Sequence, residues 1–185
     1  MLTEIQKMRS GLLADTSDPD LRARLDRAKQ LINQLNSQTY LHSSDYRDII
    51  KQLVPHLSDS SSITPPFYCD YGDGIIVGEH CFINFNCTFL DGALITIGSH
   101  TLIGPNVQIY TPHHPMNYLE RRQTKETASP VTIGDDCWIG GGSIILPGVT
   151  IGDRCIIGAG SIVTKDVPSD TTVAGNPAKV ISKIV

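Results

Sequence analysis

Residues 130–163 read PVTIGDDCWIGGGSIILPGVTIGDRCIIGAGSIV, and one pattern runs through the whole stretch. An aliphatic residue recurs every six positions, and the same spacing extends towards the N-terminus, broken by one step of eight and one of 24. Eleven of these twelve positions are β-branched, and glycine directly follows seven of them. The twelve positions are Val77, Ile83, Phe89, Ile97, Ile103, Ile109, Ile133, Ile139, Ile145, Ile151, Ile157 and Val163.

A period of six predicts a β-solenoid. Each repeat supplies a short strand whose β-branched residue points inward, and then a turn in which glycine accepts backbone angles that a Cβ would resist. Three repeats make one coil of about eighteen residues, and successive coils pair at roughly 4.8 Å. The position two residues before each aliphatic also points inward, because side chains alternate along a strand.

The five cysteines occupy this second inward position. Cys81, Cys87, Cys137 and Cys155 precede an aliphatic by two residues, and Cys69 lies six before Ile75, another inward position. We therefore expect all five to share one phase of the repeat as small buried hydrophobes. An odd count in one buried column fits neither a disulfide scaffold nor a zinc module, and it favours a reducing, cytoplasmic location.

Composition excludes several classes of protein. The chain has 185 residues with a formal net charge of −4, and its 15 basic residues form no dense cluster, which argues against nucleic-acid binding. No apolar run approaches the roughly 18 residues that span a membrane, and residues 1–18 lack the apolar core of a signal peptide.

Residues 1–56 are expected to form an N-terminal helical segment. Asp18-Pro19 is typical of an N-cap followed by proline at the first helical position. Ser43 or Ser44 can cap a second helix, which Pro55 ends because the residue before proline disfavours the helical conformation. The first helix carries one apolar stripe, formed by Leu21, Leu25, Ala28, Ile32 and Leu35.

Residues 57–185 are expected to form the solenoid domain, interrupted by a long loop at 111–130. The repeat vanishes there, and a structureless stretch of this length inside a compact domain is usually functional or disordered. The loop carries the pair His113-His114, which Pro112 and Pro115 stiffen. Two other histidines, His80 and His100, share a turn position and should face solvent.

These motifs resemble the maltose/galactoside O-acetyltransferase family, and the resemblance covers nearly the whole chain. It rests on the repeat, the N-terminal segment with Lys7-Met8-Arg9-Ser10-Gly11, and the His114-Pro115 step in the loop. Further matching segments are Pro130–Gly134, Cys137–Gly140, Pro147–Gly152, Ile162–Pro168 and Ala174–Ala178.

The resemblance implies a mainly β fold, a left-handed parallel β-helix with an N-terminal helical segment and a loop extruded from the coil. It implies transfer of an acetyl group from acetyl-CoA to a sugar hydroxyl by direct attack on the thioester. It also implies a homotrimer with sites between subunits. His114 matches the general base, and an imidazole suits that role near neutral pH. No metal is required, because the thioester is already activated.

The resemblance also assigns binding residues. The backbone N–H of Gly141 matches the oxyanion donor, and Ala159, Thr164, Lys165 and Lys179 match positions that contact CoA. Trp138 should point outward, towards a subunit or a ligand. The acceptor contacts implied by the family are Asp15, Asp70, Asn84 and Asp91, although Gly92 stands where some members carry a second acid.

Other classes remain open. An acetyltransferase acting on a non-sugar hydroxyl, of the serine or xenobiotic type, shares the solenoid and a loop histidine, and a non-catalytic structural β-helix needs neither. A metal-dependent lyase of the γ-carbonic anhydrase kind needs two zinc histidines five residues apart. The four candidates His80, His100, His113 and His114 do not supply such a pair.

Overall fold

The computed structural model describes residues 1–38 and 43–183. Its helices are α1 (Glu4–Arg9), α2 (Pro19–Asn36), α3 (Ser44–Leu53) and α4 (Tyr118–Arg121). Its strands are β1 (Ala14–Asp15), β2 (His56–Leu57), β3 (Ser62–Ile63), β4 (Phe67–Cys69), β5 (Ile75–Val77), β6 (Phe82–Ile83), β7 (Cys87–Leu90), β8 (Ile95–Ile97), β9 (Leu102–Ile103), β10 (Gln108–Tyr110), β11 (Pro112–His113), β12 (Lys125–Ala128), β13 (Val131–Ile133), β14 (Trp138–Ile139), β15 (Ile144–Ile145), β16 (Thr150–Ile151), β17 (Ile156–Ile157), β18 (Ile162–Val163), β19 (Thr171–Gly175) and β20 (Ala178–Lys183).

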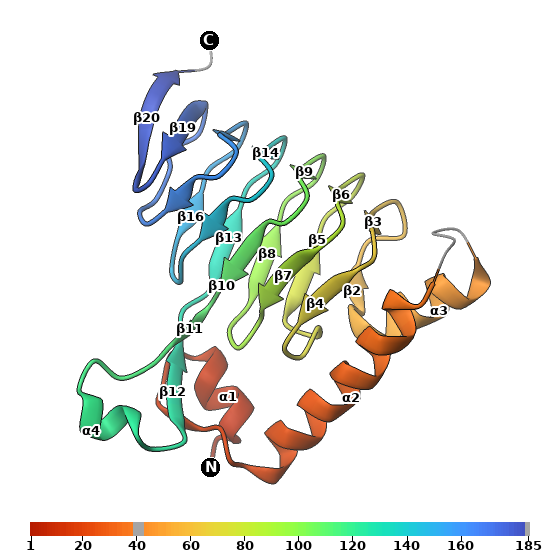
Figure 1. Ribbon diagram of the computed structural model, residues 1–185, viewed down its shortest axis with the longest axis vertical. Coiled ribbons are helices and arrows are strands. Elements are labelled where there is room, and N and C mark those ends of the chain that lie inside the picture. Colours follow the sequence, from red (N-terminus) through yellow and green to blue (C-terminus); the bar gives the residue numbers. More distant parts are fainter. Residues whose placement is uncertain (39–42, 184–185) are drawn as a thin grey trace.

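The expected parallel β-helix is confirmed. Its strands stack into three parallel faces, with coil after coil rising from the N-terminal segment towards the C-terminus (Figure 1). The first face is β2-β5-β8-β13-β16, the second is β3-β6-β9-β14-β17-β19 with the antiparallel β20 at its end, and the third is β4-β7-β10-β15-β18. All twelve predicted aliphatic positions are at most 3% exposed, so they form the core of this prism.

The repeat glycines serve a different purpose from the one expected. None of the seven has a positive φ; that conformation lies two residues later, at residues such as His80, His100 and Asp136. A Cβ added to Gly134 would stand 2.7 Å from the backbone N of Asp153 in the next coil. The glycine slot is therefore fixed by the close approach of neighbouring coils. His80 and His100 are exposed as expected, with their rings stacked 5.1 Å apart.

Four cysteines share the predicted inward slot, and the prediction is wrong for Cys69. All five are buried and free, but Cys69 pairs with Phe89 and Phe67 pairs with Cys87, so Cys69 belongs to the aliphatic column. The turn after Cys69 is two residues longer than the repeat requires, which shifts the phase. In the shared slot Cys81 Sγ donates to the Gly98 carbonyl at 2.9 Å, as Thr101 Oγ1 does to Gly134 at 2.9 Å. This inward position thus holds small side chains that can donate a hydrogen bond to a backbone carbonyl of the next coil.

The N-terminal segment closes the first coil with α2 and α3. Asp18 caps α2 through hydrogen bonds from the backbone N–H groups of Asp20 and Leu21, and Ser43 caps α3, as predicted. The short α1, with a capping box at Thr3, was not anticipated. The solenoid starts at β2, so the expected boundary between residues 56 and 57 falls inside its first strand.

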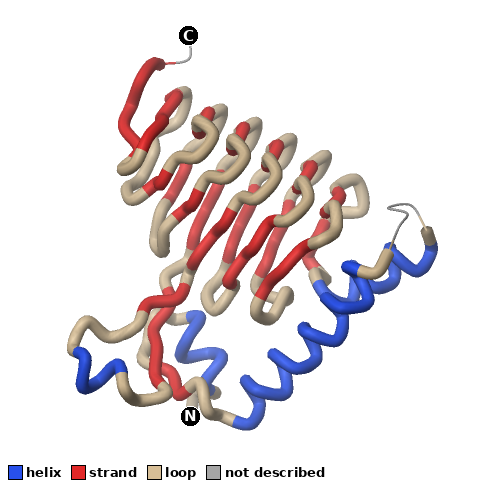
Figure 2. Tube along the Cα trace, in the orientation of Figure 1, coloured by secondary structure: helices blue, strands red, loops and turns tan. Residues whose placement is uncertain are grey.

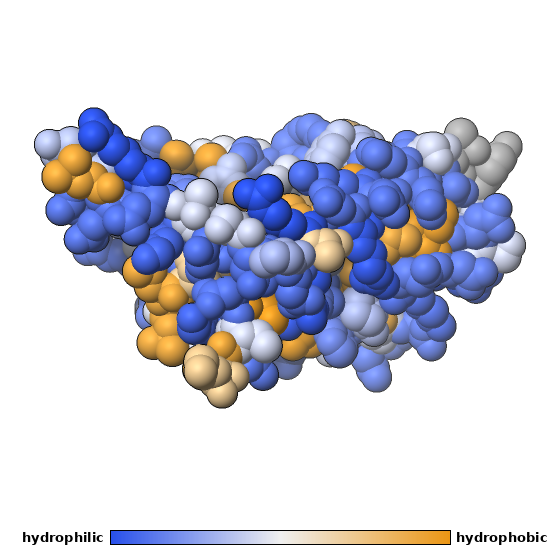
Figure 3. Space-filling model, turned by 90° about the horizontal axis from the view of Figure 1, so that it is seen from below, coloured by the Kyte–Doolittle hydropathy of each residue, from blue (hydrophilic) through white to orange (hydrophobic). Residues whose placement is uncertain are grey.

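The loop 111–130 is folded and not structureless, which corrects the expectation. It contains β11, α4 and β12, and β12 pairs antiparallel with both β11 and the N-terminal β1 (Figure 2). Ala14 pairs with Glu126, and Asp15 pairs with Lys125. A strand from the start of the chain therefore holds the loop against the prism. From below, this end of the molecule is mostly hydrophilic, with separate hydrophobic patches (Figure 3).

Candidate active site

The loop leaves the prism along one edge, where the third face passes into the first; we call it the loop edge. Stacked on it are the turns 70–74, 91–94, 111–130, 146–149 and 164–166. The two turns below the loop are two residues longer than the repeat requires, and they are fixed by side chains. Thr111 Oγ1 donates to the Leu90 carbonyl at 2.7 Å and accepts from the Ala93 N–H at 2.9 Å.

Asp91 is fully buried at the centre of this stack. Its carboxylate accepts hydrogen bonds from the backbone N–H groups of Asp70 at 3.1 Å, Tyr71 at 2.9 Å and Gly74 at 3.0 Å. Burial raises the pKa of Asp91, and the hydrogen bonds from Tyr71 and Gly74 oppose that rise. The expected contact between Asp91 and an acceptor does not fit this burial, since the carboxylate is turned into the protein to shape the 70–74 turn.

Two hollows meet at His114. One, of about 270 Å³, is lined by Thr16, Leu25, Asp70, Tyr71, Leu90, Pro112, His114 and Glu126, and we call it the acidic hollow. The other, of about 430 Å³, is lined by Leu90, Tyr110, Pro112, His113, His114, Leu146 and Pro147, and we call it the apolar hollow. The exposed His114 side chain thus borders both the hollow that contains the carboxyl groups of Asp70 and Glu126 and the apolar hollow.

The acidic hollow holds carboxyl groups with perturbed pKa values. Burial, with the neighbouring charges of Asp91 and Glu126, raises the pKa of Asp70 to about 7. Burial also raises the pKa of Glu126, while the nearby His114 acts in the opposite direction. Perturbed carboxyls beside a histidine in a hollow are typical of functional sites.

Glu126 is a site residue that the sequence reasoning missed. Its position in the loop carries no repeat, and β12 is placed by its pairing with β11 and with β1, in which Ala14 lies opposite Glu126. The sequence offered one indication, an acidic residue in the same loop as His114. An acidic loop residue is by itself too common to indicate a site.

His113 and Asp15 support the loop. The His113 Nε2 atom lies 3.0 Å from Ser129 Oγ. The Asp15 carboxylate accepts hydrogen bonds from the Ser17 N–H at 2.9 Å and from Thr124 Oγ1 at 3.0 Å, and the Ser17 contacts lower its pKa most. Asp15 does not line the acidic hollow, but its neighbour Thr16 does.

A second group of predicted residues lies along another edge, where the second face passes into the third; we call it the glycine edge. Asn84, Gly141 and Ala159 each follow a strand of the second face there. Asn84 Oδ1 accepts from the Phe85 N–H at 2.8 Å, and the Gly141 carbonyl accepts from the Gly160 N–H at 2.9 Å. Among the described residues, none accepts a hydrogen bond from the Gly141 N–H.

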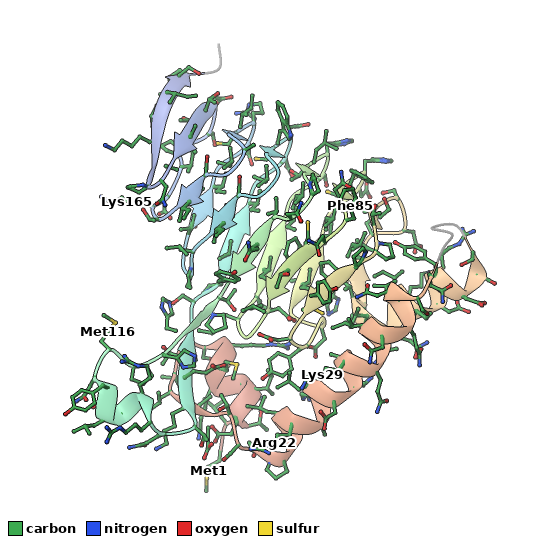
Figure 4. All side chains as sticks on the ribbon, viewed as in Figure 1. Met1, Arg22, Lys29, Phe85, Met116 and Lys165 are labelled. Carbon is green, nitrogen blue, oxygen red and sulfur yellow. The ribbon has the colours of Figure 1, made fainter. Side chains whose placement is uncertain are left out.

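The residues expected to contact CoA are also distributed over more than one edge of the solenoid. Thr164 and Lys165 are exposed on the loop edge, and Lys179 is exposed on β20, opposite Ala174. Lys165 and Phe85, the neighbour of Asn84, lie on opposite sides of the solenoid in Figure 4. One chain therefore carries His114 and the Gly141 donor on different edges.

Trp138 points outward, as expected, in a row of apolar side chains on the second face. It pairs with Leu102, which pairs with Phe82, and these three side chains are 56%, 50% and 39% exposed. We call them the apolar row. Large apolar side chains in register on a flat face are characteristic of an interaction surface.

Comparison with known proteins matches both parts of this architecture. Residues 7–58 match the maltose acetyltransferase hexapeptide capping motif, and residues 130–165 match the bacterial transferase hexapeptide repeat. Nodulation protein L of Rhizobium meliloti is 45% identical over 178 residues, which cover 96% of this chain and 97% of that protein. The chain belongs to the hexapeptide-repeat acetyltransferase family.

Two solved structures of this family superpose closely. A hexapeptide-repeat acetyltransferase from Vibrio cholerae, complexed with acetyl-CoA, has a TM-score of 0.93 and 38% identity, with all of both chains covered. A galactoside acetyltransferase in complex with coenzyme A has a TM-score of 0.94 and 35% identity, covering all of this chain and 92% of its own.

Two features are absent from the part of the chain that the structure describes. None of the helices within them is long and apolar enough to cross a membrane. The same residues contain no group of three or more histidine, cysteine, aspartate or glutamate side chains placed to hold a metal ion.

Proposed function

We propose that this protein is an acetyl-CoA-dependent O-acetyltransferase that acetylates a sugar hydroxyl, with His114 as the general base. The observation that carries the proposal is the place of His114 between the acidic and the apolar hollow. Sugar-like acceptors suit the first hollow, because carboxylates accept hydrogen bonds from hydroxyl groups. The maltose-type capping motif and the galactoside acetyltransferase neighbour support the choice of a sugar.

The reaction needs a base and an oxyanion donor. His114 takes the proton of the acceptor hydroxyl as its oxygen attacks the thioester carbon, which is typically worth about 10²–10⁴ in rate. The Gly141 N–H, which no described residue engages, stabilises the tetrahedral oxyanion. When the carbon–sulfur bond breaks, the proton on His114 passes to the departing CoA thiolate. Asp70, Asn84 and Asp15 contact or frame the acceptor, and Asp91 shapes the turn that presents Asp70.

The site is completed between copies of the chain. His114 lies on the loop edge and Gly141 on the glycine edge, so we propose a homotrimer in which one copy's loop edge faces its neighbour's glycine edge. The apolar row of Phe82, Leu102 and Trp138 supplies a surface for this contact. Acetyl-CoA then contacts Ala159 from the glycine edge, Thr164 and Lys165 from the loop edge, and Lys179 from β20. Lysines suit the anionic phosphates of CoA.

We further propose a cytoplasmic location. All five cysteines are buried free thiols, and burial raises the pKa of Cys87 and Cys137 to about 11. Such thiols are inert packing groups that suit a reducing compartment.

The test measures CoA release from acetyl-CoA with a panel of sugars and non-sugar alcohols. His114→Ala should lower kcat by about 10²–10⁴, whereas His56→Ala, at an exposed histidine of β2, should leave it unchanged. Equal activity in His114→Ala would refute the base assignment. Faster release with non-sugar alcohols would favour the serine or xenobiotic type, and no release with any acceptor would favour a structural β-helix. Native mass spectrometry tests the trimer.

A further inference from the structure

A pair of histidines lies on the remaining edge of the prism, where the first face passes into the second; we call it the histidine edge. His80 follows β5 and His100 follows β8, at the same position of two successive coils. Their rings stack with centroids 5.1 Å apart and an interplanar angle of 22°. Both side chains are exposed, and within the described residues neither imidazole takes part in a hydrogen bond or an ion pair. Two free imidazoles therefore stand side by side on this edge.

The backbone holds both histidines in place. Each has a positive φ, 56° at His80 and 58° at His100, which histidine adopts more readily than most side chains. The His80 N–H donates to Ser60 Oγ at 2.9 Å, and the His100 N–H donates to the Glu79 carbonyl at 2.8 Å. Turns fixed on adjacent coils therefore present the two imidazoles at a constant spacing, and the side-chain torsions remain free to adjust.

The coil above supplies a negative charge. Asp136 occupies the same turn position as the two histidines, one coil above His100, and its carboxylate accepts no hydrogen bond from the part of the chain that the structure describes. Arg154, one coil higher again, forms hydrogen bonds of 2.6 Å and 2.9 Å with Asp170. Asp170 accordingly contributes more than Asp136 to the raised pKa of Arg154. The charge of Asp136 is thus available to a cation bound beside His100.

We infer that His80 and His100 together bind a divalent ion of the late first-row transition metals, such as Ni²⁺, Cu²⁺ or Zn²⁺. Neutral imidazole suits these ions, whereas Mg²⁺ and Ca²⁺ take oxygen ligands. A zinc–nitrogen bond measures about 2.0–2.1 Å, so two nitrogens can share one ion when they lie within about 4 Å of each other. Rings with centroids 5.1 Å apart can reach that spacing by rotation about their side-chain torsions.

The site uses two protein ligands and leaves the other positions of the ion to water. This agrees with the absence, over residues 1–38 and 43–183, of a group of three side chains placed to hold a metal. Asp136 stabilises the ion from the coil above, since the attraction between charges acts across a few ångströms even in water. The ion bridges two coils of the folded chain, so its binding stabilises the solenoid. It makes no demand on the acetyl transfer proposed for His114.

The test is calorimetric titration of the full, untagged chain with Ni²⁺, Cu²⁺ and Mg²⁺. We expect one Ni²⁺ per chain, tighter binding of Cu²⁺ and no binding of Mg²⁺. His80→Asn and His100→Asn should each lower the Ni²⁺ affinity by about tenfold or more. Both variants should fold, because Asn86 and Asn106 have the same positive φ in other turns, at 60° and 61°. His56→Asn, at an exposed histidine of β2, should leave the affinity unchanged.

Two further measurements distinguish the pair from other histidines. Electron paramagnetic resonance of bound Cu²⁺ should show coupling to two imidazole nitrogens in the wild type and to one in either single variant. Saturating Ni²⁺ should raise the urea midpoint of the wild type and leave that of the His80→Asn/His100→Asn double variant unchanged. Asp136→Asn should weaken Ni²⁺ binding by about threefold.

Three results would overturn the inference. The first is a His80→Asn/His100→Asn double variant that binds Ni²⁺ as tightly as the wild type. The second is loss of the bound ion in a His113→Asn/His114→Asn variant instead, which would place it on the loop. The third is displacement of Ni²⁺ by Mg²⁺, which would indicate an adventitious ion only, held by surface carboxylates.

Discussion

Replacing Asp70 by asparagine should stabilise the fold at neutral and alkaline pH. The pKa of Asp70 rises from 3.8 to about 7 on folding, so the folded chain keeps a proton that the unfolded chain has released. Stability is then lost as the pH rises from about 4 to 7, because the unfolded state binds fewer protons in that window. A difference of about three pKa units corresponds to about 4 kcal/mol at most, and partial solvent access reduces this to about 2–3 kcal/mol.

Asparagine removes the charge and keeps the shape, and among the described residues the Asp70 carboxylate has no hydrogen-bond partner to lose. Urea unfolding of the wild type and Asp70→Asn, at one protomer concentration, should show the variant more stable by about 2–3 kcal/mol at pH 8 and nearly equal at pH 4. Glu79→Gln serves as the control and should show no such pH-dependent difference. A variant that is less stable at pH 8, or a gain that is the same at both pH values, would refute this electrostatic account.

Three further predictions concern other parts of the molecule. Gly134→Ala should lower the free energy of urea unfolding by about 1–3 kcal/mol, because the added Cβ would stand 2.7 Å from the backbone of the next coil. Gly142→Ala should cost less, because the space around Gly142 is open and the added Cβ would be strained only by the positive φ of 70°. Equal costs in the two variants would contradict the close-approach explanation. Asp91→Ala should lower the free energy of unfolding by about 3–5 kcal/mol, because it leaves three backbone N–H groups without an acceptor. Asp91→Asn is expected to retain some of those hydrogen bonds, so it should fold and raise KM for the acceptor more than KM for acetyl-CoA. An unchanged acceptor KM would show that Asp91 has no positioning role. Trp138→Asp should shift the mass seen under native conditions from trimer to protomer, and an intact trimer would remove the apolar row from the interface.

The solenoid was predictable because its coils pair residue for residue. Ile97 lies beside Ile133 and Ile139 beside Ile157, so the packing pattern repeats along the chain as a period. The same period misplaced Cys69, because the turn after it is two residues longer than the repeat requires and no aliphatic residue marks where the phase changes. A sequence period predicts regular spacing well. It reveals an inserted residue only where aliphatic residues on both sides of the insertion show the changed step.

The candidate site was predictable only in part. His114 stood out because the loop interrupts the repeat, and Asn84 stood out because it occupies a glycine slot of the repeat. Gly141 and Ala159 were expected from the family resemblance alone. The place of Glu126 was not predictable, because it depends on the pairing of β12 with β1, which is distant in the sequence. The β11–β12 pairing is local, but it lies in a segment that carries no repeat. Asp91 could be located in its insertion, but its burial could not be foreseen from the sequence.

The pairing of β1 with β12 joins the start of the chain to the loop that carries His114. Thr16 and Leu25, which precede the solenoid, line the acidic hollow, while the expected CoA positions belong to the solenoid and its C-terminal strand. In the proposed function the acceptor site thus combines residues that precede the solenoid with residues of the loop edge, such as Asp70 and Glu126, whereas the CoA positions lie in the solenoid and β20. Under that proposal, substitutions in the first thirty or so residues and in the loop that pairs with them would change the acceptor and leave the CoA positions in place. The stacked coils of the solenoid, which contain most of the hydrophobic core, need not change.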